Sequence, residues 1–287
     1  MIKIENVSTV GWEPAIRGAR NPMNSWDKSD TLFLNYYDEE TNTVLAYNIS
    51  HNNVQTDAWT EAGVKIGPND LKLLTNLAKA GSDEAKFRRM IVVYLDVTAP
   101  MYWWKEADTY KVGTVRNSCS TMHKIHAKEF TLDDFSTEHL TDSAKDEMQN
   151  VIDMLNESRE WYLKYDFMRD IDKELFDSAI KSKKDLWWQM IQLLPSSYNQ
   201  RATLMLNYEV LANMYHARKN HKLDEWREFC SWIEALPYAK ELIICPTVND
   251  MPICPLLDRA RTIHGETVIR DADTGEQHAL KYTIGGE

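Results

Sequence analysis

The sequence has few cysteines, no long apolar run and no excess of positive charge. Four cysteines are scattered along 287 residues, which favours reduced thiols and a cytoplasmic location over a disulfide framework. No apolar segment approaches the length of a bilayer span, and the first ten residues lack a signal-peptide pattern, so we expect no membrane association. The net charge of −11 argues against sequence-independent binding to a nucleic-acid backbone.

The residues that are present give an ordinary globular composition with many flat rings. Hydrophobic residues make up 43% and charged residues 27%, and a chain of this length buries a substantial core in one large domain or two small ones. The ten Trp and thirteen Tyr suit ring stacking, but cores and subunit interfaces use them too.

Hydrophobic patterning predicts strands early in the chain and long helices later. Strands are expected at 2–7 and at 90–97, where the apolar run suggests a central position, and a hairpin is expected over 31–50. Helices are expected at 69–80, 142–165, 173–194 and 224–236. The tail is predicted to form an extended, proline-containing arm and then a hairpin around DADTGE.

The most informative stretch runs from Leu194 to Trp226. Apolar residues recur at helical spacing from Ala202 onward, which predicts a helix with Asn207, Leu211, Met214 and Arg218 on one face. A guanidinium on such a half-buried stripe needs an anionic partner, because a lone buried charge is costly. We therefore expect Arg218 to meet either an acidic side chain or an anionic ligand.

This stretch resembles the C-terminal helix of flavin-dependent thymidylate synthases. Leu194-Pro195, eleven further residues and then Asn207, Leu211, Asn213 and Arg218 match the family pattern without a gap. The resemblance implies that Arg218 is catalytic and holds the nucleotide, while Asn207 and Asn213 hold the flavin or the nucleotide. At 100° per residue Asn213 lies about 120° from the other two, so one ligand meets all three only between subunits. The alternative is a core helix whose Arg218 pairs with an acid.

A second stretch, residues 101–130, resembles the signature region of the same family but departs from it. Thr109, Tyr110 and Lys111 stand opposite the family's Arg-His-Arg, and Met122 replaces a further Arg. Lys111 keeps a charge without the bidentate fork of an arginine. The resemblance assigns cofactor binding to Lys111 and, more loosely, to Ser25. It assigns substrate binding to Glu106, Asn117, Ser118 and Ser120. The alternatives are a polar loop or strand edge, and for Ser25 a solvated basic turn.

Cys119, His123 and His126 have the spacing C-x3-H-x2-H, so a metal site is an alternative use of this segment. A structural zinc site normally has four such ligands, and no fourth ligand is evident nearby. We predict no metal.

The resemblance implies an α+β fold, with a β-sheet packed against long helices, in a homotetramer. It covers 1–240 as one domain with 31–50 as a hairpin insertion, and leaves 241–287 as a separate arm. The implied reaction is FAD-dependent transfer of a one-carbon unit from methylene-tetrahydrofolate to C5 of deoxyuridylate (dUMP), with NADPH as co-substrate. Two alternatives stay open: a pyrimidine C5 hydroxymethylase of the same fold, and a non-catalytic nucleotide-binding or structural oligomer. Convergence of Lys111, Arg116, Arg201 and Arg218 would favour catalysis.

Overall fold

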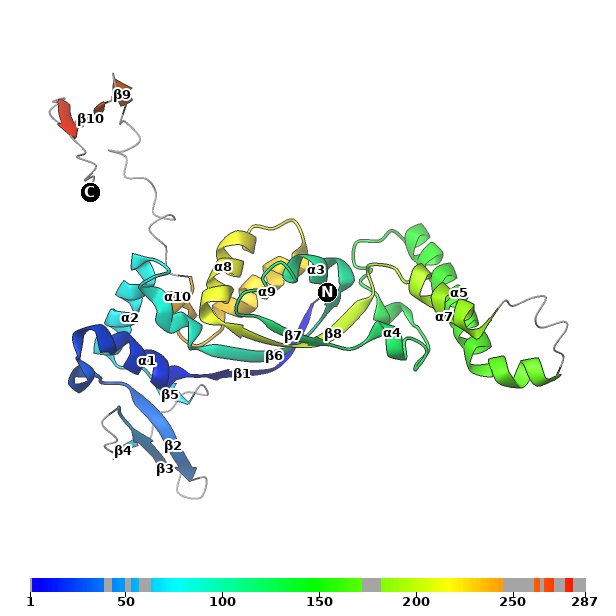
Figure 1. Cartoon of the computed structure of the whole chain (residues 1–287), viewed down its shortest axis with the longest axis horizontal. Coiled ribbons are helices and arrows are strands. Elements are labelled where there is room, and N and C mark those ends of the chain that lie inside the picture. The colour runs from blue at the N-terminus through cyan, green and yellow to red at the C-terminus, as the bar shows by residue number, and fades with distance from the viewer. Residues whose placement is uncertain are drawn as a thin grey trace, which may run out of the picture.

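The structure is a computed structural model that describes residues 2–38, 43–49, 53–56, 63–171 and 182–244, together with the strands 261–263, 266–270 and 277–280. Figure 1 shows a central sheet with helices above it, a second sheet at one end and a pair of helices extending from the other end. This mixed α+β arrangement confirms the predicted fold class. No helix in the described part is long and apolar enough to cross a membrane.

The central sheet has four antiparallel strands. They are β1 (Lys3–Val10), β6 (Val92–Pro100), β8 (Asn199–Asn207) and β7 (Val115–Ser118), in the order β1-β6-β8-β7. The predicted strand at 90–97 is therefore central, although it begins at Val92. Its side chains alternate, because Val93, Leu95 and Val97 are fully buried whereas Tyr94 between them is 43% exposed.

Helices cover one face of this sheet. They are α3 (Met101–Ala107), α8 (Tyr208–Arg218) and α9 (Asp224–Glu234). Trp103 of α3, Leu206 of β8 and Phe229 of α9 belong to one buried cluster between the two layers. The opposite face carries the exposed side chains of Val10, Tyr94 and Val115.

The segment 202–207 is a strand, and the predicted helix there is wrong. Ala202, Leu204 and Leu206 are buried and alternate with more exposed neighbours, a period of two that a short apolar run does not separate clearly from helical spacing. The helix begins only at Tyr208, and Asn207 is the residue that precedes it. Asn207 therefore does not share a helical face with Leu211 and Met214.

The second sheet confirms the predicted hairpin. Strands β2 (Leu32–Asp38) and β3 (Thr43–Tyr47) pair antiparallel, and their turn lies outside the described residues. Strands β4 (Asn53–Thr56) and β5 (Val64–Lys65) complete the order β4-β3-β2-β5. Beside them lie α1 (Trp12–Arg20) and α2 (Pro68–Ala80). The latter confirms the helix expected at 69–80, with proline at a favourable first position.

A buried ion pair fixes the loop that follows α1. The Nε atom of Arg20 lies 2.6 Å from Oδ1 of Asp70 in α2, and both side chains are at most 5% exposed. The other carboxylate oxygen of Asp70 accepts hydrogen bonds from Ser29, from the backbone of Asp30 and from both N–H and hydroxyl of Thr31. The loop is thus held by charge-assisted bonds in the protein interior.

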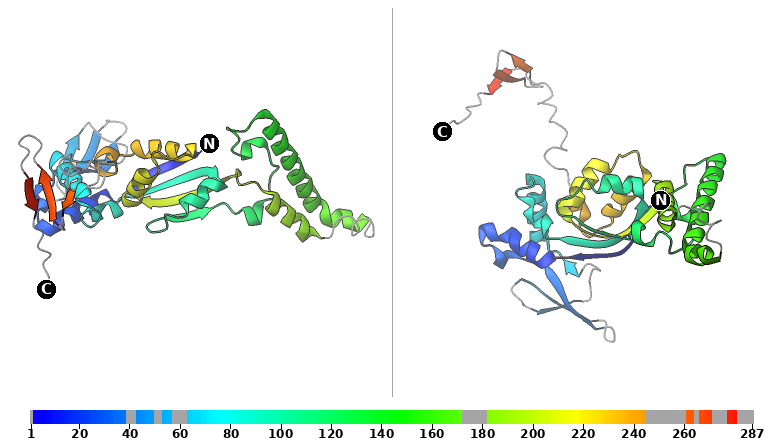
Figure 2. Two further views of the ribbon diagram at one scale, coloured as in Figure 1. Left: turned by 90° about the horizontal axis from the view of Figure 1, so that it is seen from above. Right: turned by 45° about the vertical axis from the view of Figure 1, so that its right-hand side comes forward.

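A helical arm extends beyond the sheet, as Figures 1 and 2 both show. It pairs α5 (Asp142–Ile171) with α7 (Lys183–Leu193). Ile152, Leu155 and Met190 form a core of their own with Phe130 and Phe135. The helix expected at 142–165 is confirmed and runs six residues further. Of the helix expected at 173–194, residues 173–181 lie outside the described part.

The remaining elements are short. They comprise 3-10 turns at Asn21–Met23, Trp26–Lys28, Ala85–Arg89 and Leu132–Asp134, with α4 (Thr121–Lys124), α10 (Ala239–Leu242), β9 (Arg261–Ile263), β10 (Glu266–Arg270) and β11 (Gln277–Leu280). Strands β10 and β11 pair antiparallel, which confirms the tail hairpin. The predicted arm at 245–260 lies outside the described residues, and the division of the chain into 1–240 and 241–287 stays a prediction.

Candidate functional site

Two segments far apart in the sequence meet at Glu106 and Arg218. Nη1 of Arg218, at the end of α8, lies 2.8 Å from Oε2 of Glu106 in α3. Nε of Arg218 donates to the hydroxyl of Tyr110 at 3.0 Å. The indole N–H of Trp226 donates to the same Glu106 oxygen at 2.9 Å. The anionic partner expected for Arg218 is therefore Glu106, and the two charges largely offset each other.

Aromatic rings surround this ion pair. The Arg218 guanidinium carbon lies 5.0 Å from the centre of the Trp226 ring and 5.7 Å from that of Tyr110, within the range of cation–π attraction. Nε2 of His221 lies 3.0 Å from Nη1 of Arg218 and 3.4 Å from Glu106. The Arg218 side chain is 21% exposed and that of Glu106 is 35% exposed, so solvent reaches the pair.

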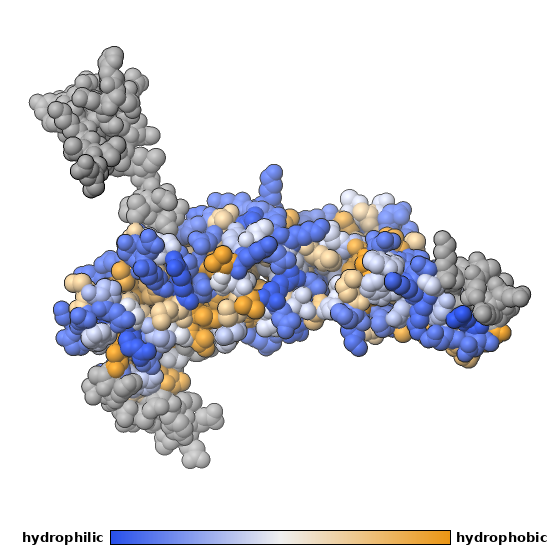
Figure 3. Space-filling view, viewed as in Figure 1, coloured by the Kyte–Doolittle hydropathy of each residue, from blue (hydrophilic) through white to orange (hydrophobic). Residues whose placement is uncertain are grey.

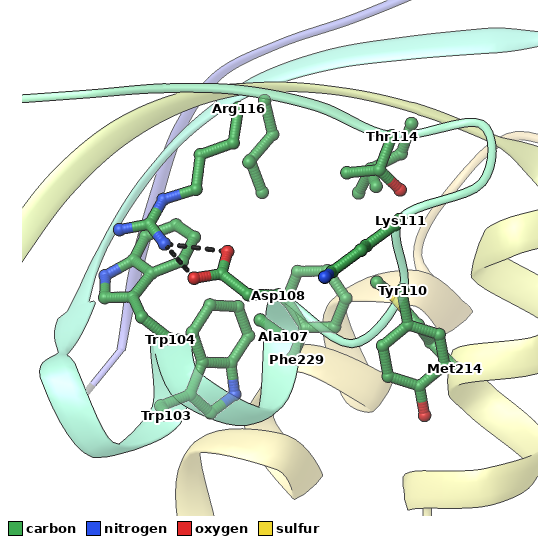
Figure 4. Close-up of a pocket in the computed structure, with 12 residues that line it drawn as sticks. Trp103, Trp104, Ala107, Asp108, Tyr110, Lys111, Thr114, Arg116, Met214 and Phe229 are labelled. Atoms are coloured by element: carbon green, nitrogen blue, oxygen red, sulfur yellow. Dashed lines mark hydrogen bonds and ion pairs between the residues drawn. The ribbon is translucent and has the colours of Figure 1, made fainter.

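A pocket of about 390 Å³ lies beside this cluster, between the sheet and the helices. Figure 4 shows the rings of Trp103, Trp104 and Phe229 on its helical side. Leu204 and Leu206 of β8 line it from the sheet. The other lining residues are Ala107, Asp108, Tyr110, Lys111, Thr114, Arg116 and Met214. Tyr110 therefore belongs both to this aromatic pocket and to the Glu106–Arg218 cluster.

Arg116 is held rigidly at one end of the aromatic pocket. Its Nη1 lies 2.8 Å and 2.7 Å from the two carboxylate oxygens of Asp108, and Nη2 donates to Oε1 of Gln200 at 2.6 Å. Its guanidinium carbon lies 3.9 Å above the ring of Trp104. Figure 4 shows Lys111 on the other side of the pocket, with its amino group directed inward.

The four cations proposed to converge do not do so. Lys111 and Arg116 share the aromatic pocket, whereas Arg218 is paired with Glu106. Arg201 lies on the open face of the sheet, 2.8 Å from Asp96. Hydrogen bonds from Thr203, Arg201 and Asn6 hold the pKa of Asp96 well below its usual value. Among the described residues, these four cations thus form one group, Lys111 with Arg116, and two separate ion pairs, Arg218 with Glu106 and Arg201 with Asp96.

Comparison with known proteins identifies the fold. Neither a protein-family model nor a curated protein matches the sequence. A solved structure of thymidylate synthase X from Helicobacter pylori with FAD and dUMP matches with a TM-score of 0.51 and 12% sequence identity, covering 85% of this chain and 97% of that one. A second structure of the flavin-dependent enzyme from the same organism, also with FAD and dUMP, covers 84% and 99% with the same TM-score and identity.

The chain has the fold of the flavin-dependent thymidylate synthases. The match spans nearly the whole of the solved chains and confirms the fold expected from two short sequence motifs. At 12% identity it shows the shape of the chain, so ligands and activity have to be argued from this chain's own residues.

Asn207 begins a helix in this thymidylate synthase-like fold. Its side-chain oxygen accepts a hydrogen bond from the backbone N–H of Val210 at 3.0 Å, which is N-capping geometry. The residue is 9% exposed. Gly113 packs against it at a positive φ of 78°, and a methyl group on Gly113 would lie 2.6 Å from Nδ2 of Asn207. The ligand role of Asn207 stays a prediction beside this observed structural one.

Replacing Asn207 with alanine is expected to lower the free energy of unfolding by about 1 kcal/mol, because the helix loses its cap. Asn207→Asp retains an oxygen at the same place and should keep most of the stability. Urea denaturation of the two variants tests this expectation. Equal stability of Asn207→Ala and the wild type would show that the cap contributes nothing.

The other residues assigned by resemblance to ligands of the thymidylate synthase-like fold lie apart. Asn117 pairs in register with Thr203 and so faces the open side of the sheet, whereas the neighbouring Arg116 faces the aromatic pocket. Ser118 ends β7, and the Ser120 hydroxyl caps α4 by accepting from the His123 N–H at 3.1 Å. Asn213 is exposed on α8. The roles of these residues stay predictions.

Ser25 lies in the loop after α1, at the end of the sheet away from Ser118. Its hydroxyl and carbonyl oxygens accept hydrogen bonds from Nη1 of Arg20. A single chain therefore does not bring Ser25 to the segment that holds Asn117, Ser118 and Ser120. The role of Ser25 stays a prediction.

The thiols and histidines show no metal-binding geometry in the described part of the chain, where no three potential ligands gather. Nδ1 of His123 lies 2.8 Å from the Ser120 hydroxyl, and the His126 ring packs on Tyr162. Burial raises the pKa of the Cys230 thiol to about 11, so Cys230 is protonated and unreactive at neutral pH.

Proposed function

We propose that this chain binds FAD and a pyrimidine deoxynucleotide monophosphate, and transfers a one-carbon unit from methylene-tetrahydrofolate to C5 of the pyrimidine, with NADPH as co-substrate. The observation that carries the proposal is the fold, since both solved structures that match it contain FAD and dUMP. Glu106 and Arg218, which come from the two segments that resemble the family, are in direct contact.

The ion pair leaves ligand-binding capacity unused. In the described part of the chain, neither Nη2 of Arg218 nor Oε1 of Glu106 makes a hydrogen bond. Arg218 would donate to an acceptor of the nucleotide, and the Tyr110 hydroxyl, which already accepts from Arg218, is free to donate its own proton. Glu106 would fix the guanidinium and accept from the ligand.

The residues present also fit a flavin by charge. Lys111 has no ionic partner among the described residues and suits a phosphate of FAD, although as a point charge rather than a bidentate fork. When bound, FAD supplies the hydride for the one-carbon transfer. Because Ser25, Asn213 and the β7 residues are separated in one chain, we propose that a homotetramer assembles the complete site between subunits.

The first test is retention of flavin by the purified protein after FAD is added and excess removed by desalting. We expect the flavin absorbance band to persist in the wild type and to be lost in Lys111→Met, which removes the charge proposed to pair with a phosphate of FAD. Lys105→Met is the matched control, because it removes another exposed lysine charge from nearby α3. A positive result justifies an assay with dUMP, in which the product mass separates methyl from hydroxymethyl transfer.

A second candidate function is nucleotide binding without catalysis. It is favoured by the Glu106–Arg218 ion pair, which neutralises the cation expected to stabilise developing charge, and by the separation of the four cations. Thermal stabilisation by dUMP without flavin retention would favour this candidate. Absence of both flavin retention and stabilisation by dUMP would overturn both proposals.

A further inference from the structure

The Glu106–Arg218 cluster presents its hydrogen-bonding groups to a ligand in a fixed order. Arg218 bonds to Glu106 through Nη1 and to the Tyr110 hydroxyl through Nε. In the part of the chain that the structure describes, no hydrogen bond joins Glu106 to Tyr110 directly. Arg218 therefore lies between the other two side chains. The three come from α3, the turn after it and α8, so the fold sets their order.

Each of these three groups has an unused hydrogen-bonding position. Oε1 of Glu106 and Nη2 of Arg218 make no hydrogen bond to any described residue. The Tyr110 hydroxyl accepts from Arg218 and gives its own proton to none of the described residues. As the anionic partner of a guanidinium, the Glu106 carboxylate can only accept, whereas the Arg218 N–H groups can only donate. The order offered to a ligand is therefore acceptor, donor, donor.

His221 supports the orientation of Glu106. Its Nδ1 accepts the backbone N–H of Leu223 at 3.2 Å, so the ring proton of the neutral imidazole lies on Nε2. Nε2 lies 3.4 Å from Oε2 of Glu106, the same oxygen that Arg218 and Trp226 contact. Three N–H groups thus face Oε2. This arrangement leaves Oε1 as the free acceptor, and His221 has no second proton to offer a ligand.

The cluster is half-buried in largely apolar surroundings. Trp226, which contacts Glu106, is fully buried. Helices α3, α8 and α9 lie in the middle of the molecule, where Figure 3 shows apolar residues gathered between the helices and the sheet. A ligand group that meets the wrong partner here loses its hydrogen bond to water without gaining another, which costs free energy. The order of the three groups therefore selects among ligands.

Cytosine has the complementary edge. Its N4 amino group donates and its N3 and O2 atoms accept, in the order donor, acceptor, acceptor, and carboxylates are suitable partners for this amino group. Uracil presents O4, N3–H and O2, in the order acceptor, donor, acceptor. Against the same three groups, O4 would face the carboxylate of Glu106 and N3–H would face the guanidinium of Arg218. Two of the three uracil contacts would therefore be mismatched.

We propose that this site prefers a cytosine base, so that deoxycytidylate (dCMP) binds more tightly than dUMP. The inference rests on the proposed function, because it takes the pyrimidine nucleotide to lie against Glu106 and Arg218. Glu106 accepts from the N4 amino group, Arg218 donates to N3 and Tyr110 donates to O2. The two nucleotides share the same sugar and phosphate, so the ratio of their affinities reports on the base alone.

The test is isothermal titration of the full chain in excess FAD. The probes are dCMP, dUMP and the 2-pyrimidinone deoxynucleotide monophosphate, which is dCMP without its amino group. We expect dCMP to bind roughly tenfold to hundredfold more tightly than dUMP, the discrimination that one correct pair of base contacts provides. The pyrimidinone nucleotide should bind more weakly than dCMP, because it has no donor for Glu106.

Two variants separate base recognition from general support of the site. Glu106→Gln keeps an oxygen toward Arg218 and Trp226 and turns an amide N–H group toward the ligand, so the ratio of dCMP to dUMP affinity should fall close to unity. A merely structural role of Glu106 would weaken both nucleotides and leave the ratio unchanged. Tyr110→Phe is the matched control. It removes a donor to O2, which both bases carry, and should weaken both nucleotides with the ratio unchanged.

The outcomes distinguish this inference from the proposed function. Equal binding of dCMP and dUMP by the wild type, tighter binding of dUMP, or an unchanged ratio in Glu106→Gln would overturn the inference. Tighter binding of dUMP together with retained flavin would leave the proposed function standing. Failure to bind either nucleotide would overturn the proposed function as well.

Discussion

Replacement of Arg20 by methionine is expected to lower the free energy of unfolding by about 3–5 kcal/mol at neutral pH, which is the usual cost of removing one partner from a buried ion pair. The carboxylate of Asp70, with 0% side-chain exposure, would remain charged in the interior without its guanidinium. The loop that Arg20 and Asp70 fix together would loosen, because Arg20 also donates to the Ser25 carbonyl at 3.1 Å.

Arg17→Met provides the matched control for this measurement. Arg17 lies on the same helix and pairs with Glu13 at 2.9 Å, but its side chain is 51% exposed, and exposed pairs of this kind contribute about 0.3–0.5 kcal/mol. Urea denaturation at pH 7 compares the two variants directly. A loss for Arg20→Met no larger than that for Arg17→Met would show that the buried pair does not stabilise the fold.

Replacement of Gly11 by alanine is expected to cost about 3 kcal/mol. Gly11 joins β1 to α1 at a φ of +89°, and a methyl group there would lie 2.0 Å from the backbone oxygen of Met90. The backbone of Met90 leads into β6 and cannot move aside as a flexible side chain would. The substitution therefore combines left-handed backbone strain with a clash between main chains.

Gly63→Ala separates these two contributions. Gly63 has a similar φ of +69°, but nothing lies within 4 Å of the added methyl group, so only the strain of about 1–2 kcal/mol should appear. Thermal denaturation of both variants measures the difference. Equal melting temperatures would mean that the junction between β1 and α1 yields freely to the added methyl group.

The parts of the fold that the sequence predicted are those with an unambiguous period or a clear stop signal. The central strand at 90–97, the helix before Gly81 and the hairpin at 31–50 were of this kind. Residues 202–207 were not, because Leu204 and Leu206 satisfy a strand's alternation while Leu204 also begins an i, i+7 series toward Leu211. Residues 202–207 form a strand because they pair with β6 and β7. Local sequence patterns do not predict pairing between segments that are far apart in the sequence.

The candidate site shows the same limit. The need of Arg218 for an anionic partner followed from its place on an apolar stripe, and Glu106 was recognised only through the motif resemblance. The aromatic pocket was not predicted, since its lining comes from α3, the segment 108–114, β7, β8, α8 and α9, and no local pattern records which strands become neighbours. Paired tryptophans at 103 and 104 next to Lys105 and Asp108 were the available signal, but rings of this kind are as common in filled cores.

The direct passage of β8 into α8 has a consequence for how the chain avoids misfolding. Asn207 is both the last residue of the strand and the cap of the helix, with no loop between them to absorb an error. A slip of β8 by one residue against β6 would turn Leu204 and Leu206 to the open face. It would also move Asn207 away from Gly113 and carry Arg218 away from Glu106. The register of β8 against β6 and the position of Arg218 therefore depend on each other. A sheet with β8 shifted by one residue loses the Glu106–Arg218 contact.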